Sequence, residues 1–214
     1  MYNTRILNKS DSIIAEECFN IFNEKVKHVK NYTFDYNNID RFVSWLRKKY
    51  YECSVDDYAI AVSFRNNDII GFQIGFKIHI LYNRENLTFP YWYLSVHCHT
   101  IDHFKFPGEL SGQMALKLMN HFEQQKYYTF YTLVRLPKQL SKTADVDNYL
   151  DTMYQKNYPL YRYHRYIEQV CYDNESLEKV KQLYKGYYKF FPNVIHRPVV
   201  LMKYEMKNNY RELL

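Results

Sequence analysis

The chain has 214 residues, 47% of them hydrophobic, which fits a single α/β domain large enough to bury a core. No stretch approaches the roughly 18 consecutive apolar residues of a membrane span, so we expect a soluble protein with no membrane partner. The formal net charge is +6, but no nucleic-acid-binding motif accompanies it, so we expect no nucleic-acid partner either.

The N-terminus and the cysteines point to the cytoplasm. Residues 1–12 lack the basic stretch and the apolar run of a secretory signal, so a cytoplasmic location is expected. The cysteines are Cys18, Cys53, Cys98 and Cys171, with no C-x-x-C pair among them. In a chain of this length without a signal, we expect them to be reduced rather than paired in disulfides.

Two amphipathic helices are predicted before any strand. Ser10 and Asp11 can cap the first helix, which is expected to end near Lys30. Asn38 can cap the second helix, and Asp40 in its first turn suits the positive end of the helix dipole. The apolar residues of the second helix recur at i, i+3, i+4 and i+7: Ile39, Phe42, Val43 and Leu46.

The period then changes from 3.6 to 2, which is typical of strands. Residues 58–64 and 69–80 predict two strands joined by the polar turn 65–68. A third strand, 89–100, follows the polar turn 83–86. Every even-numbered position from 70 to 80 is apolar, so the register of the second strand is firmly specified. The three strands predict an antiparallel meander.

A helix over residues 108–126 follows the meander. Its apolar stripe contains Met114, Ala115, Leu118 and Phe122. Residues 127–135 are rich in β-branched and aromatic side chains and predict another strand. Because the connection runs through a helix, we expect this strand to lie parallel to the third.

The remaining pattern completes the expected fold. It predicts in order a helix, a strand, a helix and a strand, at 144–156, 160–172, 175–190 and 199–206. We therefore expect the α/β (α+β) class: a mixed, mostly antiparallel central sheet with flanking helices, in a single domain of residues 1–214. The core would span about residues 10–172. A helix–strand extension, 173–214, could enlarge the sheet, cover an acceptor site or form the contact of a homodimer.

Three segments carry a family resemblance. YLSVH at 93–97 is similar to a central strand of the pattern L-x-V that precedes a loop and a helix. GQMALKLM at 112–119 places a small residue four positions before a leucine, and MYQKNYPLY at 153–161 is similar to Tyr-x-Lys-x-Gly-Phe. With the order of elements, these segments make the chain resemble a divergent member of the GNAT-type N-acetyltransferases.

The resemblance implies a GNAT-like acyltransferase fold and an N-acyltransferase that uses acetyl-CoA or another acyl-CoA as co-substrate, without a metal. An amine of unknown identity would be the acceptor. The donor site would involve the central strand and the start of the next helix: Leu94, Ser95, Val96, Gly108, Glu109, Leu110, Ser111, Gly112 and Gln113. Backbone N–H groups at a helix start, at the positive end of the dipole, favour a bound phosphate.

Two residue types are expected to move protons. Acyl transfer to an amine needs a base for the attacking nitrogen and an acid for the departing thiolate. Tyr154 matches the family position that protonates the thiolate. His97 and His99 lie two apart on the predicted third strand, and imidazole, with an unperturbed pKa of about 6.5, suits the base. We prefer His97, because it lies nearer the point where the family's strands splay.

One alternative is a non-catalytic role. The family's pyrophosphate loop has Gln or Arg where Glu109 stands and Gly or Ala where Met114 stands, and Tyr158 replaces the glycine of the later segment. A chain with this fold and a degraded phosphate loop could be a binding or interaction module that meets its partner through a basic, Tyr-rich surface.

Another alternative is a metal site. His97 and His99 form an H-x-H pair, and Asp102 and His103 follow closely, so three ring nitrogens could hold zinc and activate water. A hydrolytic metal site normally draws a further ligand from a distant element. The sequence does not identify one.

Overall fold

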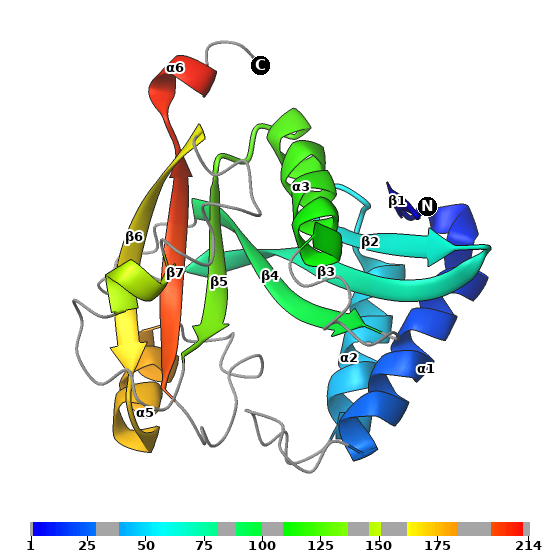
Figure 1. The fold of residues 1–214 in the computed structure, drawn as a ribbon, viewed down its shortest axis with the longest axis horizontal. Coiled ribbons are helices and arrows are strands. Elements are labelled where there is room, and N and C mark those ends of the chain that lie inside the picture. The colour runs from blue at the N-terminus through cyan, green and yellow to red at the C-terminus, as the bar shows by residue number, and fades with distance from the viewer. Residues whose placement is uncertain are drawn as a thin grey trace. The chain divides into compact units, whose positions relative to one another are not determined.

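A computed structural model describes residues 2–28, 39–80, 89–99, 109–136, 146–150, 162–183 and 198–211. The strands are β1 (Asn3–Ile6), β2 (Tyr58–Arg65), β3 (Asp68–Ile80), β4 (Phe89–His99), β5 (Thr129–Arg135), β6 (Tyr163–Cys171) and β7 (Val199–Met206). The helices are η1 (Lys9–Asp11), α1 (Ser12–His28), α2 (Ile39–Glu52), α3 (Glu109–Gln124), α5 (Asn174–Leu183) and α6 (Asn208–Arg211) (Figure 1). The hydrogen-bonded strand order is β1-β2-β3-β4-β5-β7-β6.

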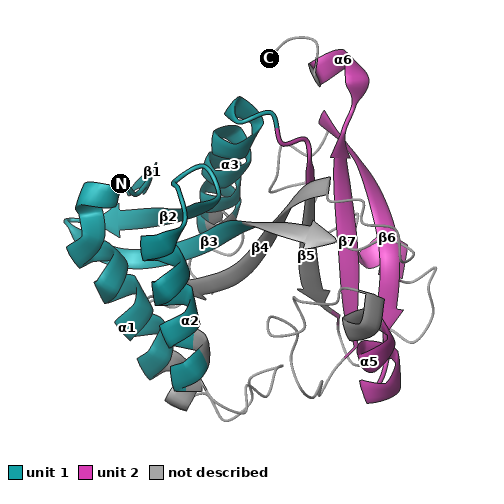
Figure 2. Ribbon diagram, turned by 180° about the vertical axis from the view of Figure 1, so that it is seen from behind, with its two compact units in different colours: residues 1–30, 38–76, 94–126 teal, residues 31–37, 77–93, 127–214 magenta. Residues whose placement is uncertain are grey.

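The chain divides into two compact units (Figure 2). The first contains residues 1–30, 38–76 and 94–126, and the second contains 31–37, 77–93 and 127–214. Both β3 and β4 cross from one unit to the other, so the division falls inside strands rather than at a linker. The expectation of a single domain stays a prediction.

The first unit contains the antiparallel hairpin of β2 and β3 with β1 added at the side of β2. Tyr58 pairs with Phe76 at one end of the hairpin, and Asn3 pairs with Phe64 at the far end of β1. The prediction that two helices precede any strand is therefore wrong, because β1 and η1 come before α1. The four residues of β1 are too few to show an alternating pattern, and β1 is stabilised by its pairing with β2.

The helices α1 and α2, both predicted, cover one face of this hairpin through a chain of aromatic rings. The ring of Phe19 lies 6.0 Å from that of Tyr50, and Tyr50 lies 6.2 Å from Tyr58. Tyr58 stacks on Phe76 at 6.1 Å, and Trp45 meets Phe76 edge-on at 5.8 Å. Edge-on and offset ring pairs of this kind stabilise a core beyond the area they bury.

The helix α3 covers the opposite face. The predicted apolar stripe is confirmed, since all of its members are at most 3% exposed: Met114, Ala115, Leu118 and Phe122. The backbone of β3 comes so close to α3 that a Cβ on Gly75 would lie 2.6 Å from Phe122 and 3.5 Å from Leu118. A side chain at position 75 would therefore force the Phe122 ring or α3 to shift.

The second unit contains β5, β6 and β7, with β7 between the other two. Thr129 of β5 pairs with Glu205 of β7, and Cys171 of β6 pairs with Val199. Residues 199–202 of β7 are at most 1% exposed, so both faces of the strand are covered there. The C-terminal extension therefore enlarges the sheet, which is one of the three roles expected for it.

The predicted parallel relation of the strands at 89–100 and 127–135 is confirmed. Trp92 of β4 pairs in parallel with Phe130 of β5, and Tyr93 pairs with Tyr131. The helix expected at 144–156 is described only over 146–150, which are helical. The helix α5 packs on β6, and its Leu177 is fully buried.

Candidate functional site

The candidate site is the junction at which β4 is followed by α3, both within the first unit from Leu94 onward. The helix begins at Glu109, one residue after the predicted start. Its first four backbone N–H groups, those of residues 109–112, have no acceptor within the helix. They lie at the positive end of a 16-residue helix, which is the arrangement that binds anions elsewhere.

The first turns of α3 separate into a buried and an exposed side. Leu110 is 2% exposed and Met114 is fully buried, so both side chains belong to the core of the first unit. Met114, which departs from the family's glycine or alanine, therefore does not fill the solvent side of the helix start. Gly112 is buried as well, whereas Gln113 and Lys117 are exposed one turn apart.

Glu109 was the other departure from the family's loop. Glu109 is the first residue of α3, and the structure does not describe the surroundings of its side chain. An acidic residue in the first turn of a helix is favourable to the dipole. It also lowers the attraction of the same helix start for a phosphate.

The structure describes the backbone of β4 but not the surroundings of its side chains. Leu94, Ser95, Val96, His97 and His99 all belong to this strand. Residues two apart in a regular strand share one face, so the shared face of the two histidines stays an expectation. Gly108 and Tyr154 lie outside the described residues, and Ser111 lies in the first turn of α3. The roles of His97 and Tyr154 stay predictions.

For the metal and membrane expectations, the structure describes only part of the chain. Within the described ranges, no group of three or more histidine, cysteine or acidic residues could hold a metal ion. Asp102 and His103 of the zinc alternative lie outside those ranges. In the same part of the chain, no helix is sufficiently long and apolar to cross a bilayer.

A histidine that the sequence did not single out joins α3 to the rest of the first unit. The Nε2 atom of His121, near the end of α3, lies 2.8 Å from the backbone carbonyl oxygen of Val55, and its ring meets that of Phe122 at 5.2 Å. This hydrogen bond ties α3 to the loop that precedes β2.

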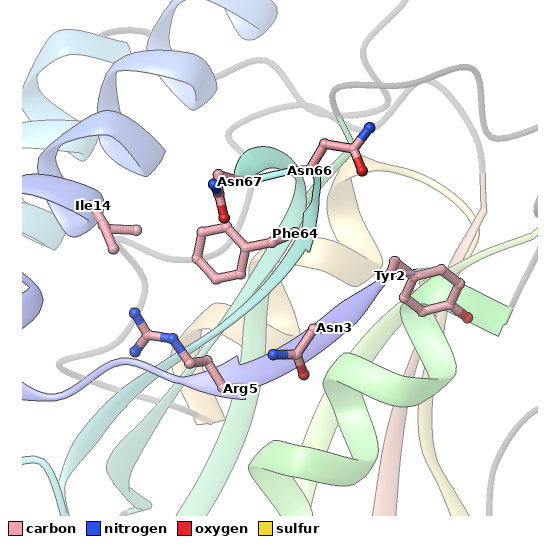
Figure 3. Close-up of a pocket in the computed structure, with 7 residues that line it drawn as sticks. All are labelled: Tyr2, Asn3, Arg5, Ile14, Phe64, Asn66 and Asn67. Atoms are coloured by element: carbon pink, nitrogen blue, oxygen red, sulfur yellow. The ribbon is translucent and has the colours of Figure 1, made fainter.

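A hollow beside β1 in the first unit also lies outside the sequence-based predictions. It is a cavity of about 530 Å³ beside β1, lined in part by Arg5, Phe64 and the asparagines of the β2–β3 turn (Figure 3). The sequence predicted the polar turn at 65–68 but gave no signal that its side chains would line a cavity with β1. That relation depends on the pairing of β1 with β2.

Comparison with known proteins identifies the fold. No protein-family model and no curated protein sequence matches the chain. Among solved structures, a protein of Desulfovibrio desulfuricans described as an acetyltransferase of the GNAT family superposes with a TM-score of 0.52 at 10% identity, covering 96% of this chain and 99% of that one.

Two further similar structures are yncA of Salmonella typhimurium, described as an acetyltransferase with its cofactor acetyl-CoA, and the ribosomal-protein-S18-alanine N-acetyltransferase of Escherichia coli. Their TM-scores are 0.49 and 0.48, each at 12% identity, and each covers 97% of this chain and 95% of the other. At such low identity, similarity to the Desulfovibrio structure shows the fold and not the activity. The chain has the fold of the GNAT-type acetyltransferases, as the sequence predicted.

Proposed function

We propose that the chain is an N-acyltransferase that moves an acyl group, acetyl in the simplest case, from a CoA thioester to an amine. The observation that carries the proposal is the GNAT-type fold, with β4 followed by a helix that begins at Glu109. A shared fold does not by itself fix an activity. The proposal therefore also depends on the chemistry of the helix start.

The start of α3 supports binding of the CoA pyrophosphate. The N–H groups of residues 109–112 have no acceptor within the helix, which suits them to donate to a phosphate at the helix start. Gln113 and Lys117 are exposed beyond the amides, so a neutral donor and a cation accompany them on that side. Glu109 is the unfavourable member, since its charge opposes a phosphate.

The acyl donor, when bound, supplies a thioester carbonyl. Transfer forms a C–N bond to the amine and breaks the C–S bond, while the attacking nitrogen loses a proton and the thiolate gains one. We assign the first proton transfer to His97, an imidazole on β4, and the second to Tyr154. Phenol, with a pKa of about 10, suits proton donation better than base catalysis.

Isothermal titration of the full chain with acetyl-CoA and CoA tests the proposal. We expect one site per chain, with affinity raised severalfold in Glu109→Gln and lowered severalfold in Gln113→Glu, since each change alters the charge at the anion site by one. Gln125→Glu adds the same charge just beyond the other end of α3 and is the matched control.

The proposal is rejected if neither ligand produces heat or a change in the midpoint of thermal unfolding. It is also rejected if Gln113→Glu and Gln125→Glu weaken binding equally, because the ligand then responds to net charge and not to the helix start. Once binding is established, release of free CoA thiol with a panel of small amines and peptide amino groups identifies the acceptor.

A non-catalytic binding role is favoured by two exposed tyrosines of the second unit. Tyr166 and Tyr172, of β6 and just after it, are 44% and 41% exposed, and the Nζ atom of Lys203 lies 5.5 Å from the centroid of the Tyr166 ring. Rings next to cations can stack on unpaired bases. Salt-dependent binding of single-stranded RNA, together with no response to CoA, would support this role in place of acyl transfer.

A further inference from the structure

The cavity beside β1 has the size and the setting of a small-molecule site. Its volume is about 530 Å³, within the range of roughly 300–1,000 Å³ that ligand pockets occupy. Strand β1, the start of α1, strand β2 and the β2–β3 turn all contribute to it (Figure 3). The lining residues that matter here are Asn3, Arg5, Ile14, Phe64, Asn66 and Asn67.

Two departures from regular strand geometry occur where Phe64, Asn66 and Asn67 line this cavity. Ser63 pairs with Gly71, but Phe64 pairs with Ile69, so β3 has one extra residue at this point. Such a bulge increases the local twist and re-aims the neighbouring side chains. Directly after it, Asn66 and Asn67 have φ angles of 52° and 72°, a left-handed turn that asparagine tolerates better than most residues.

The charge of the cavity is balanced internally. The guanidinium of Arg5 donates two hydrogen bonds to the carboxylate of Asp11, at 2.6 and 2.9 Å, and its Cζ atom lies 5.5 Å from the centroid of the Phe64 ring. Asp11 also accepts a hydrogen bond from the backbone N–H of Asn8 at 2.7 Å. An anionic ligand would have to compete with a bidentate carboxylate, which is a strong partner for arginine.

The remaining polar groups are carboxamides. Asn3, Asn66 and Asn67 are exposed, and each amide offers two donors and an acceptor oxygen. A hydroxyl both donates and accepts, so several hydroxyl groups on one ligand match three amides in a way that phosphate or an ammonium group does not. Phe64 and Ile14 supply an apolar wall against which the C–H face of such a ligand can pack.

We propose that this cavity binds a neutral, polyhydroxylated small molecule of the size of a monosaccharide or disaccharide. A purely apolar ligand is disfavoured, since it would remove the carboxamides from water without replacing their hydrogen bonds. A cationic ligand is disfavoured because none of the residues that line the cavity carries a carboxylate, whereas Arg5 carries a positive charge. The site is independent of the proposed acyl transfer, and its test requires no CoA.

Ligand-observed saturation-transfer NMR on the full chain, followed by titration, tests the proposal with neutral hexoses and disaccharides, their phosphorylated forms and benzyl alcohol. We expect transfer to the neutral sugars only. Asn67→Gly and Asn66→Gly each remove a carboxamide while glycine accepts the positive φ, so the turn is kept. Each is expected to weaken sugar binding by about tenfold, equivalent to about 1.4 kcal/mol.

The controls distinguish binding at this cavity from non-specific binding elsewhere on the protein. Asn209→Ala removes an exposed carboxamide from α6, outside the cavity lining, and should leave sugar binding unchanged. Thermal unfolding of each variant verifies that the fold is intact. The proposal is overturned if no neutral sugar shows transfer, or if both turn variants bind sugar as the unchanged chain does. It is also overturned if a phosphorylated sugar binds more tightly than the same sugar without phosphate, or if benzyl alcohol binds more tightly than the neutral sugars.

Discussion

A Cβ atom on Gly75 of β3 would lie 2.6 Å from Cε2 of Phe122 on α3. Real Cβ atoms do not approach carbon atoms this closely, so a side chain at position 75 would displace α3 or the Phe122 ring. The contact sets the distance between the sheet and the helix whose start is proposed to hold CoA. It is therefore a point at which packing and function are coupled.

Gly75→Ala is expected to lower the free energy of unfolding by about 1–3 kcal/mol, the usual effect of overpacking a core. Urea denaturation followed by circular dichroism measures the loss. The double variant Gly75→Ala, Phe122→Leu should recover part of it, because leucine vacates the position of Cε2. Equal stability of Gly75→Ala and the unchanged chain would show that the helix is not seated on the strand as described.

Tyr58→Phe is expected to leave the free energy of unfolding unchanged or to raise it by up to about 1 kcal/mol. The hydroxyl of Tyr58 is buried and has no hydrogen-bond partner among the residues that the structure describes, and burial raises the pKa of this tyrosine well above its usual value. Removing the hydroxyl removes an unsatisfied polar group and keeps the stacked ring.

Tyr50→Phe is the matched control, since the hydroxyl of Tyr50 donates to the carbonyl oxygen of Asn8 at 3.1 Å. It should lose about 0.5–1.5 kcal/mol by the same denaturation measurement. If Tyr58→Phe is the more destabilising of the two, the Tyr58 hydroxyl has a partner and this account of it is wrong.

Asp11→Asn is expected to destabilise the protein at neutral pH and to flatten its acid denaturation. The hydrogen bonds from Arg5 hold the pKa of Asp11 below its usual value. A carboxylate with a lowered folded pKa contributes stability above its unfolded pKa of about 3.9, and the contribution is lost as the pH falls through the folded pKa.

The loss at neutral pH should be about 0.5–1 kcal/mol, as for a partly exposed ion pair. Stability measured at intervals from about pH 5 to pH 2 should fall less steeply in Asp11→Asn than in the unchanged chain. Glu17→Gln, at an exposed position of α1, is the control and should retain the full slope. A slope in Asp11→Asn as steep as that of the control would contradict the assignment.

His97→Gln is expected to lower kcat for acyl transfer by about 10²–10⁴, the usual contribution of a general base, while the Kd for acetyl-CoA stays the same. The fall in rate at acidic pH should also disappear, since it reports protonation of the imidazole. His99→Gln tests the other histidine of β4. If His99→Gln produces the larger loss and abolishes the acidic limb, the base is His99.

The sequence predicted the parts of the fold that depend on local periodicity. The even-numbered apolar positions of β3 and the stripe of α3 are strong signals, and both elements form where they were expected. The bulge at Phe64 could not be predicted in this way, because it depends on which residue of β2 each residue of β3 meets. The strand β1 was missed for the same reason.

The candidate sites also contain some features that follow from the local sequence pattern and others that depend on strand pairing. A helix start after the central strand could be predicted from a glycine, polar residues and an amphipathic run, and α3 begins within one residue of the predicted position. The departure at Met114 looked unfavourable in sequence, yet its side chain belongs to the core. The cavity beside β1 could not be predicted, because Asn3 and Asn67 are brought together only by strand pairing and a turn.

The place of β7 between β5 and β6 has a consequence for how the protein is made. Both neighbours are synthesised before β7, so each leaves the ribosome without the strand that joins them in the finished sheet. Until β7 emerges, β5 and β6 have open hydrogen-bonding edges that favour intermolecular association. We expect nascent chains stalled before Val199 to be clients of cellular chaperones.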